Sequence, residues 1–211
     1  MNLQEYFYDH YDSLMPKMCD GYESFLDVAA GVVPSGVRSV AEFGIGTGNL
    51  SQRIQGRIPG IEIYGVDKNE KTLAISASKL SNFHPYCRDF FDGDFPPADC
   101  FVTSLAMHHL STGNRRSQLL SLAESSNVFV NFDFALFDGR TYDDVIVSSM
   151  RHCAKSFGTE QLALIEREMR ANDNYMSLAE QVELFESGGF EFRIHEVRDP
   201  FIVYSVVSKN S

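Results

Sequence analysis

A run of glycines beside an acidic residue is the part of the 211-residue chain that most clearly could do chemistry. Residues 42–49 read Glu-Phe-Gly-Ile-Gly-Thr-Gly-Asn, after the apolar run Arg38–Phe43 and before a helical pattern. Glycine at positions 44, 46 and 48 lets the backbone turn sharply and approach a ligand closely. The amides that open the following helix favour an anionic group. An ordinary strand-to-helix turn would use the same residues, so the loop alone leaves both interpretations open.

The glycine spacing and the next acidic residues narrow the kind of ligand. A dinucleotide fingerprint, G-x-G-x-x-G, requires a glycine at position 49, where this chain has Asn49. Asp67 ends the apolar run Ile61–Val66 and can accept hydrogen bonds from both hydroxyls of a ribose. Asp89 could hold an exocyclic adenine amine, with Phe90 against the ring. Each carboxylate could equally be a helix cap or a surface charge.

Two adjacent histidines, His108 and His109, follow the apolar run Asp99–Leu105. Ligands of open α/β sheets bind beyond the carboxyl ends of the strands, where a histidine can act as a general base or orient an acceptor. Both could instead be packing residues of the turn. Because adjacent residues leaving a strand point opposite ways, we expect at most one, His108, to face the pocket.

Short apolar runs alternate with helical patterns along most of the chain, which predicts right-handed βαβ units and a mostly parallel sheet. The final two runs are joined by Asp199-Pro200, a short connection that predicts an antiparallel hairpin. The predicted strands are Arg38–Phe43, Ile61–Val66, Phe83–Arg88, Asp99–Leu105, Asn127–Phe132, Phe190–Val197 and Phe201–Val207.

Helical patterns outside this alternation are expected at about 1–35 and 137–175. The second segment carries long apolar stripes, which are more typical of a core or a subunit contact than of a substrate pocket. Its charges are mixed, so no patch of one sign indicates a charged substrate. Arg151 and His152 are its candidate acceptor contacts. We expect the whole chain, 1–211, to form a single domain.

Composition sets further bounds on function. The formal net charge is -11, which disfavours binding to a phosphate backbone. The four cysteines are far apart and show no spacing typical of zinc, so no metal is expected. The N-terminus has neither the basic start nor the apolar stretch of a signal peptide, and no apolar run approaches the length of a membrane helix. A cytoplasmic protein is the expectation.

The order of these motifs resembles that of the class I S-adenosylmethionine-dependent methyltransferases. The runs VAEFGIGTGNLS, IYGVDKN, CRDF and DCFVTSLAMHHL carry the likeness, and the last is especially similar to a subgroup acting on small molecules. The ending from Ser177 and the segment around Tyr11 also resemble this subgroup. The likeness implies a Rossmann-like α/β fold with a seven-stranded, mostly parallel sheet, a C-terminal antiparallel hairpin, helices on both faces and an added helical lid.

The resemblance also implies roles for individual residues. Glu42 and Gly44 would lie near the methionine amine of the cofactor, Gly46 and Gly48 along its methionine and ribose portions, and Asp67 at the ribose hydroxyls. A further set would complete the site, with Asp89 and Phe90 at the adenine, Ser104 to Met107 at the methionine end, and Tyr11 folding over from the N-terminal segment.

The implied reaction is in-line transfer of a methyl group from S-adenosylmethionine to a small molecule, a metabolite or a natural-product intermediate, leaving S-adenosylhomocysteine. His108 would be the base or orienting residue, with His109, Arg151 and His152 toward the substrate. The alternatives are an enzyme that modifies the cofactor itself, a non-catalytic cofactor-binding protein, and, disfavoured by Asn49, a nicotinamide-dependent oxidoreductase. No nucleic-acid or membrane partner is expected, and a homodimer is possible.

Overall fold

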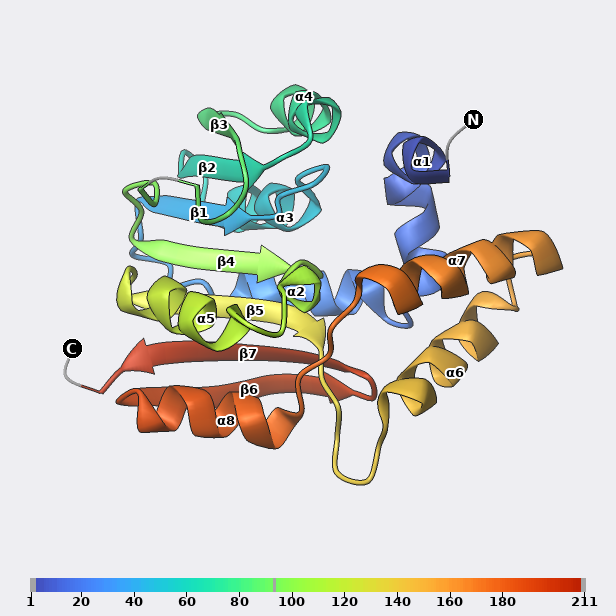
Figure 1. Ribbon diagram of the computed structural model, residues 1–211. Helices are drawn as coiled ribbons and strands as arrows, with labels where there is room; N and C mark the ends of the chain where they lie inside the picture. Colours follow the sequence, from blue (N-terminus) through green and yellow to red (C-terminus); the bar gives the residue numbers. More distant parts are fainter. Residues whose placement is uncertain (1–2, 93, 210–211) are drawn as a thin grey trace.

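A computed structural model describes residues 3–92 and 94–209, with side chains described from residue 10 onward. Within this part, seven strands form one sheet in the order β3-β2-β1-β4-β5-β7-β6 (Figure 1). The strands are β1 (Ser39–Phe43), β2 (Glu62–Asp67), β3 (Phe83–Cys87), β4 (Cys100–Ser104), β5 (Val128–Phe134), β6 (Phe190–Arg198) and β7 (Phe201–Ser208).

Helices fill the connections between strands and the N-terminal segment. They are α1 (Leu3–Met18), α2 (Tyr22–Val32), α3 (Asn49–Arg57), α4 (Glu70–Lys79), α5 (Arg115–Glu124), α6 (Tyr142–Cys153), α7 (Thr159–Asn172) and α8 (Leu178–Ser187), with the short 3-10 turn η1 (Met107–His109). The predicted capping box opens α8, where the Ser177 hydroxyl accepts from the amide of Glu180, and Gly188 ends that helix.

The first five strands run parallel, whereas β7 is antiparallel to both of its neighbours, β5 and β6. The predicted Rossmann-like sheet with its C-terminal hairpin is therefore confirmed. Pro85 lies within β3. It is tolerated because β3 is an edge strand, where a missing amide costs no ladder bond on the outer side.

Alternation along the strands divides the core between the two faces of the sheet. Val102 of β4 packs in a cluster with Phe25 of α2, while its neighbour Phe101 packs in a second cluster with Leu122 of α5 and Phe185 of α8. Successive strand residues point to opposite faces, so one strand supplies both layers. Helices consequently cover both faces, as predicted.

The segment predicted as a helical insertion forms α6 and α7, which lie with α1 beyond the arrowheads of the parallel strands (Figure 1). Its apolar stripe builds a third, smaller core that includes Val145, Ile146, Ile165 and Met169. The stripe is therefore largely internal packing, the more common role for such a pattern. These helices cover the edge of the sheet where β1, β2, β4 and β5 all end.

Candidate active site

The glycine loop connects β1 to α3 and adopts a backbone that only glycine takes readily. Gly44, Gly46 and Gly48 have φ angles of +69°, +53° and +79°. A Cβ at Gly44 would lie 2.5 Å from the Cβ of Ala106 and 2.9 Å from Cζ of Phe90. At Gly46 the nearest atom to such a Cβ is the Gly44 carbonyl oxygen, at 4.0 Å. The loop is therefore packed tightly at one end and open at its centre, as a cradle for a ligand requires.

Asp67 connects this loop to the start of α4. One of its carboxylate oxygens accepts from the Gly46 amide and the other from the Asn69 amide, both at 2.9 Å. The side chain stays partly exposed at the end of β2. A carboxylate offers about four acceptor positions. Asp67 can therefore hold the loop in place and still accept hydrogen bonds from two ribose hydroxyls.

Glu42 lies behind the loop and is only 1% exposed. Its Oε2 accepts from the Ser51 amide at 3.1 Å and from the Ser51 hydroxyl at 2.5 Å, so it fixes the first turn of α3. Burial raises the pKa of Glu42 to about 8, although the hydrogen bonds from Ser51 act to lower it. The structure gives this residue a positioning role, and its contact with the methionine amine stays a prediction.

The buried carboxyl of Glu42 makes stability depend on pH. The pKa of Glu42 is about 8 in the folded chain and near 4.5 in the unfolded chain, so the folded state binds more protons between these pH values. The free energy of unfolding therefore falls as pH rises through that window. Glu42→Gln removes this titration. Chemical unfolding from pH 5 to 8 should show a steeper decline of the free energy of unfolding in wild type than in the variant, by up to about 1.4 kcal/mol per pH unit. Equal slopes would contradict the assignment, and exposed Glu183→Gln should keep the wild-type slope.

The N-terminal helix is tied to the loop by Asp12. The Asp12 carboxylate accepts from the Thr47 hydroxyl at 2.6 Å, the side-chain amide of Asn49 at 3.0 Å and the Lys79 ammonium at 2.5 Å. Tyr11 directly precedes Asp12 on the same helix and is half-buried, with a pKa well raised by burial. The predicted approach of this segment to the cofactor loop therefore has a specific anchor, which the sequence interpretation did not identify.

The remaining predicted cofactor residues lie at the same edge of the sheet. Phe90 is half-buried against Gly44 and makes an edge contact with Phe43, with ring centroids 6.5 Å apart. Asp89 is exposed beside it, and Ser104 is partly exposed at the end of β4. Met107 differs, because its side chain is buried in the core under α5 and α8. Its contact with a cofactor would therefore come from its backbone.

His108 is the buried histidine of the pair, and its role as a base or orienting residue stays a prediction. A sharp turn at Leu105, with φ +51°, leads from β4 into η1 and places the ring against Asp133 of β5. The Nδ1 atom lies 2.5 Å from Oδ1 of Asp133, whose other oxygen accepts from the amides of Met107 and His108 at 2.8 and 3.1 Å. Burial opposes a charge on this ring, but Asp133 and Asp173 outweigh it and raise the pKa of His108.

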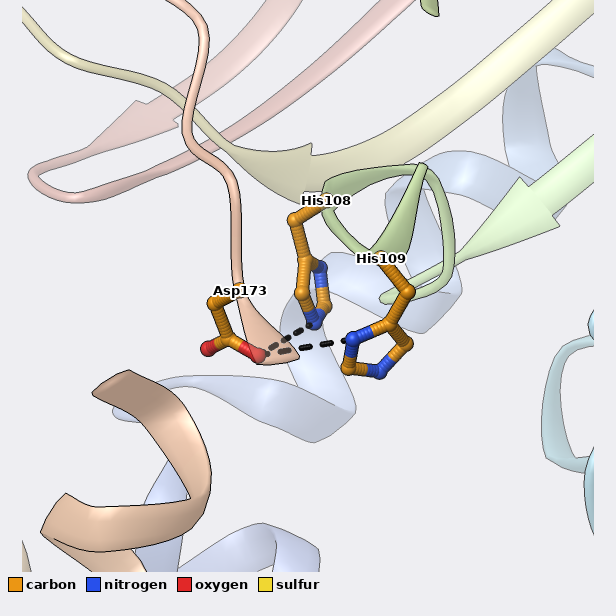
Figure 2. A group of neighbouring side chains, drawn as sticks. All are labelled: His108, His109 and Asp173. Atoms are coloured by element: carbon orange, nitrogen blue, oxygen red, sulfur yellow. Dashed lines mark ion pairs between the residues drawn. The ribbon is translucent and has the colours of Figure 1, made fainter. Parts of the chain in front are cut away.

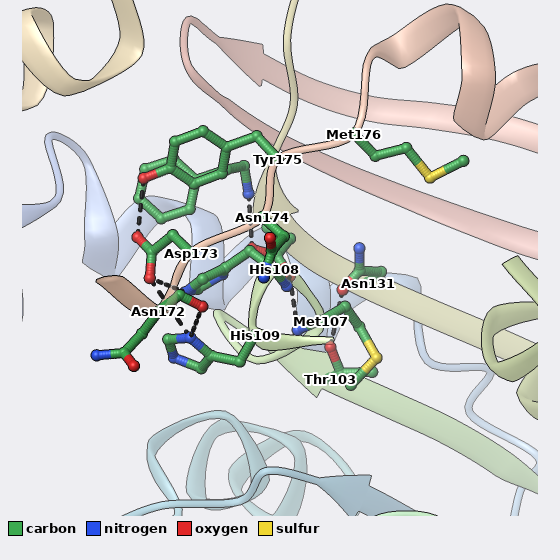
Figure 3. A network of polar contacts seen from close by, with 12 residues as sticks. Thr103, Met107, His108, His109, Asn131, Asn172, Asp173, Asn174, Tyr175 and Met176 are labelled. Carbon is green, nitrogen blue, oxygen red and sulfur yellow. Dashed lines mark hydrogen bonds and ion pairs between the residues drawn. The ribbon is translucent and has the colours of Figure 1, made fainter. Parts of the chain in front are cut away.

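His109 and Asp173 complete this polar group (Figure 2). Oδ1 of Asp173 lies 3.7 Å from Nε2 of His108 and 3.4 Å from Nδ1 of His109. The hydroxyl of Tyr175 donates to the other oxygen of Asp173 at 2.8 Å. Figure 3 shows how the segment after α7 brings Asp173 and Tyr175 over the two histidines. Both histidines therefore face the same acidic side chain, that of Asp173.

The structure does not bring Arg151 and His152 to this group. They lie in the last turn of α6, whereas Tyr142, its first residue, stacks on Tyr175 with ring centroids 5.0 Å apart. A helix of 12 residues is about 18 Å long, so the two candidates sit at its far end. The prediction of acceptor contacts from these two residues has no support from the fold.

Two acidic residues of the group were not identified from the sequence. Asp133 directly follows the predicted strand Asn127–Phe132, the position that singled out Asp67 after its own strand, so the same signal was present. Asp173 lies in a connection rich in charged and polar residues, and no local pattern distinguishes it. Its role depends on the packing of α7 across η1.

Comparison with known proteins shows that the chain is similar to methyltransferases. No protein-family model matches it. A Bacillus velezensis protein described as an uncharacterized methyltransferase is 29% identical over 189 residues, which is 85% of this chain and 80% of that protein. The plantazolicin methyltransferase BpumL, solved with S-adenosylhomocysteine and a desmethyl-plantazolicin analogue, matches with TM-score 0.70 and 13% identity over 98% of this chain and 90% of its own.

A longer enzyme shares the fold as well. Human N-acetylserotonin methyltransferase, solved with S-adenosylmethionine, matches with TM-score 0.60 and 16% identity over 88% of this chain and 51% of its own. The resemblance to class I methyltransferases is confirmed by these similarities: a relative described as a methyltransferase matches most of the chain, and neighbours solved with S-adenosylmethionine or S-adenosylhomocysteine share its fold. In the described part of the chain, no helix combines the length and apolarity needed to cross a membrane.

Proposed function

We propose that this chain transfers a methyl group from S-adenosylmethionine to a small-molecule acceptor that binds beside η1. The observation that carries the proposal is the common edge of the sheet, where the open glycine loop and Asp67 stand next to the buried His108–Asp133 pair. One half of this edge fits a nucleoside with an amino-acid tail. The other half offers polar atoms to a second ligand.

The solved neighbours support a small-molecule acceptor by analogy of fold. One is described as a plantazolicin methyltransferase and another as a mitomycin 7-O-methyltransferase, the latter with TM-score 0.60 and 14% identity. The charge of the chain supports the same proposal, because a net charge of -11 disfavours a nucleic-acid substrate.

Positioning and exclusion of water are the contributions expected of this chain. S-adenosylmethionine supplies an already activated methyl group when bound. Fixing two reactants in line can lower a barrier by roughly 7–11 kcal/mol. The loop and Asp67 would fix the cofactor, and α6 and α7 cover the acceptor side from solvent. Asp133 holds Nδ1 of His108, which leaves Nε2 on the side of exposed His109 to orient a polar atom of the acceptor.

Formation of S-adenosylhomocysteine tests the proposal. The purified chain is incubated with S-adenosylmethionine and a panel of small alcohols, phenols, thiols and amines, and the product is measured by mass spectrometry. We expect product only with an acceptor present, together with a gain of one methyl group in that acceptor, and none from Asp67→Ala.

The alternatives predict different products. A cofactor-modifying enzyme would consume S-adenosylmethionine without any acceptor, and a cofactor-binding protein without activity would bind S-adenosylhomocysteine but form no product with the whole panel. Either result would overturn the proposal. Asp99→Ala, at the opposite end of the strands, is the matched control and should keep wild-type turnover.

A further inference from the structure

His108, His109 and Asp173 direct three ligand atoms toward one point (Figure 2). These atoms, Nε2, Nδ1 and Oδ1, all lie within 4.8 Å of one another. The side chains of His108 and Asp173 are each 7% exposed, whereas that of His109 is 53% exposed. The group is therefore anchored in the protein on one side and open to solvent on the other.

The two distances to Asp173 are longer than those of ordinary hydrogen bonds. The two nitrogens stand 3.7 and 3.4 Å from Oδ1 of Asp173, beyond the 2.7–3.2 Å of an ordinary N–H···O bond, and the Asn172 carbonyl oxygen lies 3.5 Å from Nδ1 of His109. In a tetrahedral zinc site with bonds of about 2.0–2.1 Å, neighbouring ligand atoms are separated by about 3.3–3.4 Å. The observed spacing is closer to that of ligands around a shared ion.

Partners outside the group orient each of the two buried ligands. Nδ1 of His108 contacts Oδ1 of Asp133 at 2.5 Å, which leaves Nε2 as the nitrogen that can ligate an ion. The Tyr175 hydroxyl donates to Oδ2 of Asp173 at 2.8 Å, which leaves Oδ1 facing the histidines. A carboxylate behind a ligating histidine and a hydrogen bond to a ligating carboxylate are the usual supports of a metal site. Figure 3 shows the second of these supports, Tyr175 against Asp173, beside the two histidines.

We infer that His108, His109 and Asp173 bind a divalent transition-metal ion of the zinc type, with a further coordination position open toward the acceptor side. Two imidazoles and a carboxylate suit Zn²⁺ and its neighbours in the first transition series, and three protein ligands with an open position are typical of catalytic rather than structural zinc. The sequence analysis predicted no metal, because Asp173 is remote from the adjacent histidines and the spacing of cysteines and histidines matches no zinc motif.

A consequence for the reaction rests on the proposed function. An acceptor hydroxyl or thiol at the open position would lose its proton to solvent more readily, because a bound cation would lower its pKa. Its lone pair would then form the new bond to the methyl carbon, while the carbon–sulfur bond of the sulfonium breaks and the sulfur keeps the electron pair. This chemistry favours oxygen or sulfur acceptors over amines that are already neutral nucleophiles.

Titration with Co²⁺ tests the site without cofactor or acceptor. The chain, free of any affinity tag, is dialysed against a chelator and then titrated while its visible absorption is recorded. We expect one equivalent of Co²⁺ to give the absorption of a four- or five-coordinate site, and Zn²⁺ to displace it. His109→Ala should abolish that absorption. Tyr175→Phe, which removes a supporting hydrogen bond only, should weaken Co²⁺ binding about 10–100-fold.

A matched histidine far from the group separates a built site from surface binding. His84 is an exposed histidine of the edge strand β3 that pairs with Glu62 at 2.5 Å, and His84→Ala should leave the titration unchanged. An absent Co²⁺ signal, or a signal that His109→Ala retains, would overturn the inference. If the signal is absent while methyl transfer persists, only the metal site fails. If Co²⁺ binds but no acceptor is ever methylated, the proposed function fails instead.

Discussion

Gly44→Ala is expected to weaken the binding of S-adenosylhomocysteine by more than about 100-fold and to lower the free energy of unfolding by about 2–5 kcal/mol. An alanine at φ +69° costs about 1–2 kcal/mol in backbone conformation. Its Cβ would also lie 2.5 Å from Cβ of Ala106 and 2.9 Å from Cζ of Phe90. The loop and Phe90 must move apart to relieve this clash, and ligand binding must reverse that movement.

Gly60→Ala is the matched control for this prediction. Gly60 has φ +86°, and a Cβ there would meet nothing within 4 Å. We therefore expect the backbone cost alone, about 1–2 kcal/mol by chemical unfolding, and unchanged affinity by calorimetry. If Gly44→Ala behaves like Gly60→Ala in both measurements, the close packing of the cofactor loop against Phe90 is not needed for binding.

Asp67→Ala is expected to reduce the affinity for S-adenosylhomocysteine at least about 100-fold. Hydrogen bonds to a charged group contribute about 1.5–3 kcal/mol each, and the ribose offers two hydroxyls to this carboxylate. The variant also leaves the amides of Gly46 and Asn69 without the acceptor that now holds them at 2.9 Å. Calorimetric titration measures the change in affinity, and chemical unfolding measures the accompanying loss of stability.

A structural carboxylate of the same kind provides the control for Asp67. Asp99 is also partly exposed and also accepts from two backbone amides, those of Arg38 at 2.8 Å and Ser39 at 3.2 Å. It precedes β4, at the edge of the sheet opposite the glycine loop. Asp99→Ala should therefore lose stability but keep its affinity. Equal losses of affinity in the two variants would mean that Asp67 acts only by holding the backbone.

The cofactor half of the site could be predicted from the sequence because its signals are local. A strand end, three alternating glycines and an acid at the end of the next strand lie on short stretches of chain, and parallel strands bring their carboxyl ends to one edge. The observed φ angles of Gly44, Gly46 and Gly48 and the clamp from Asp67 to the Gly46 amide follow from that arrangement.

The acceptor half was less predictable because its contacts join distant residues. His108 meets Asp133, 25 residues further along the chain. The anchor of α1 on the cofactor loop is also remote in sequence, because Asp12 contacts Thr47, 35 residues away. Such pairs depend on how α1 and α7 pack over the sheet edge, which no local pattern encodes. Arg151 and His152 belong to the predicted covering segment but lie at the end of α6 remote from Tyr142, and their contact with an acceptor stays a prediction.

Calorimetric titration of the wild-type chain with S-adenosylhomocysteine, and separately with NADH, tests the central claim most directly. We predict one S-adenosylhomocysteine bound per chain, binding lost in Asp67→Ala, and no binding of NADH. No heat of binding with S-adenosylhomocysteine, or saturable binding of NADH in its place, would contradict the assignment of the glycine loop and Asp67 to an S-adenosylmethionine site.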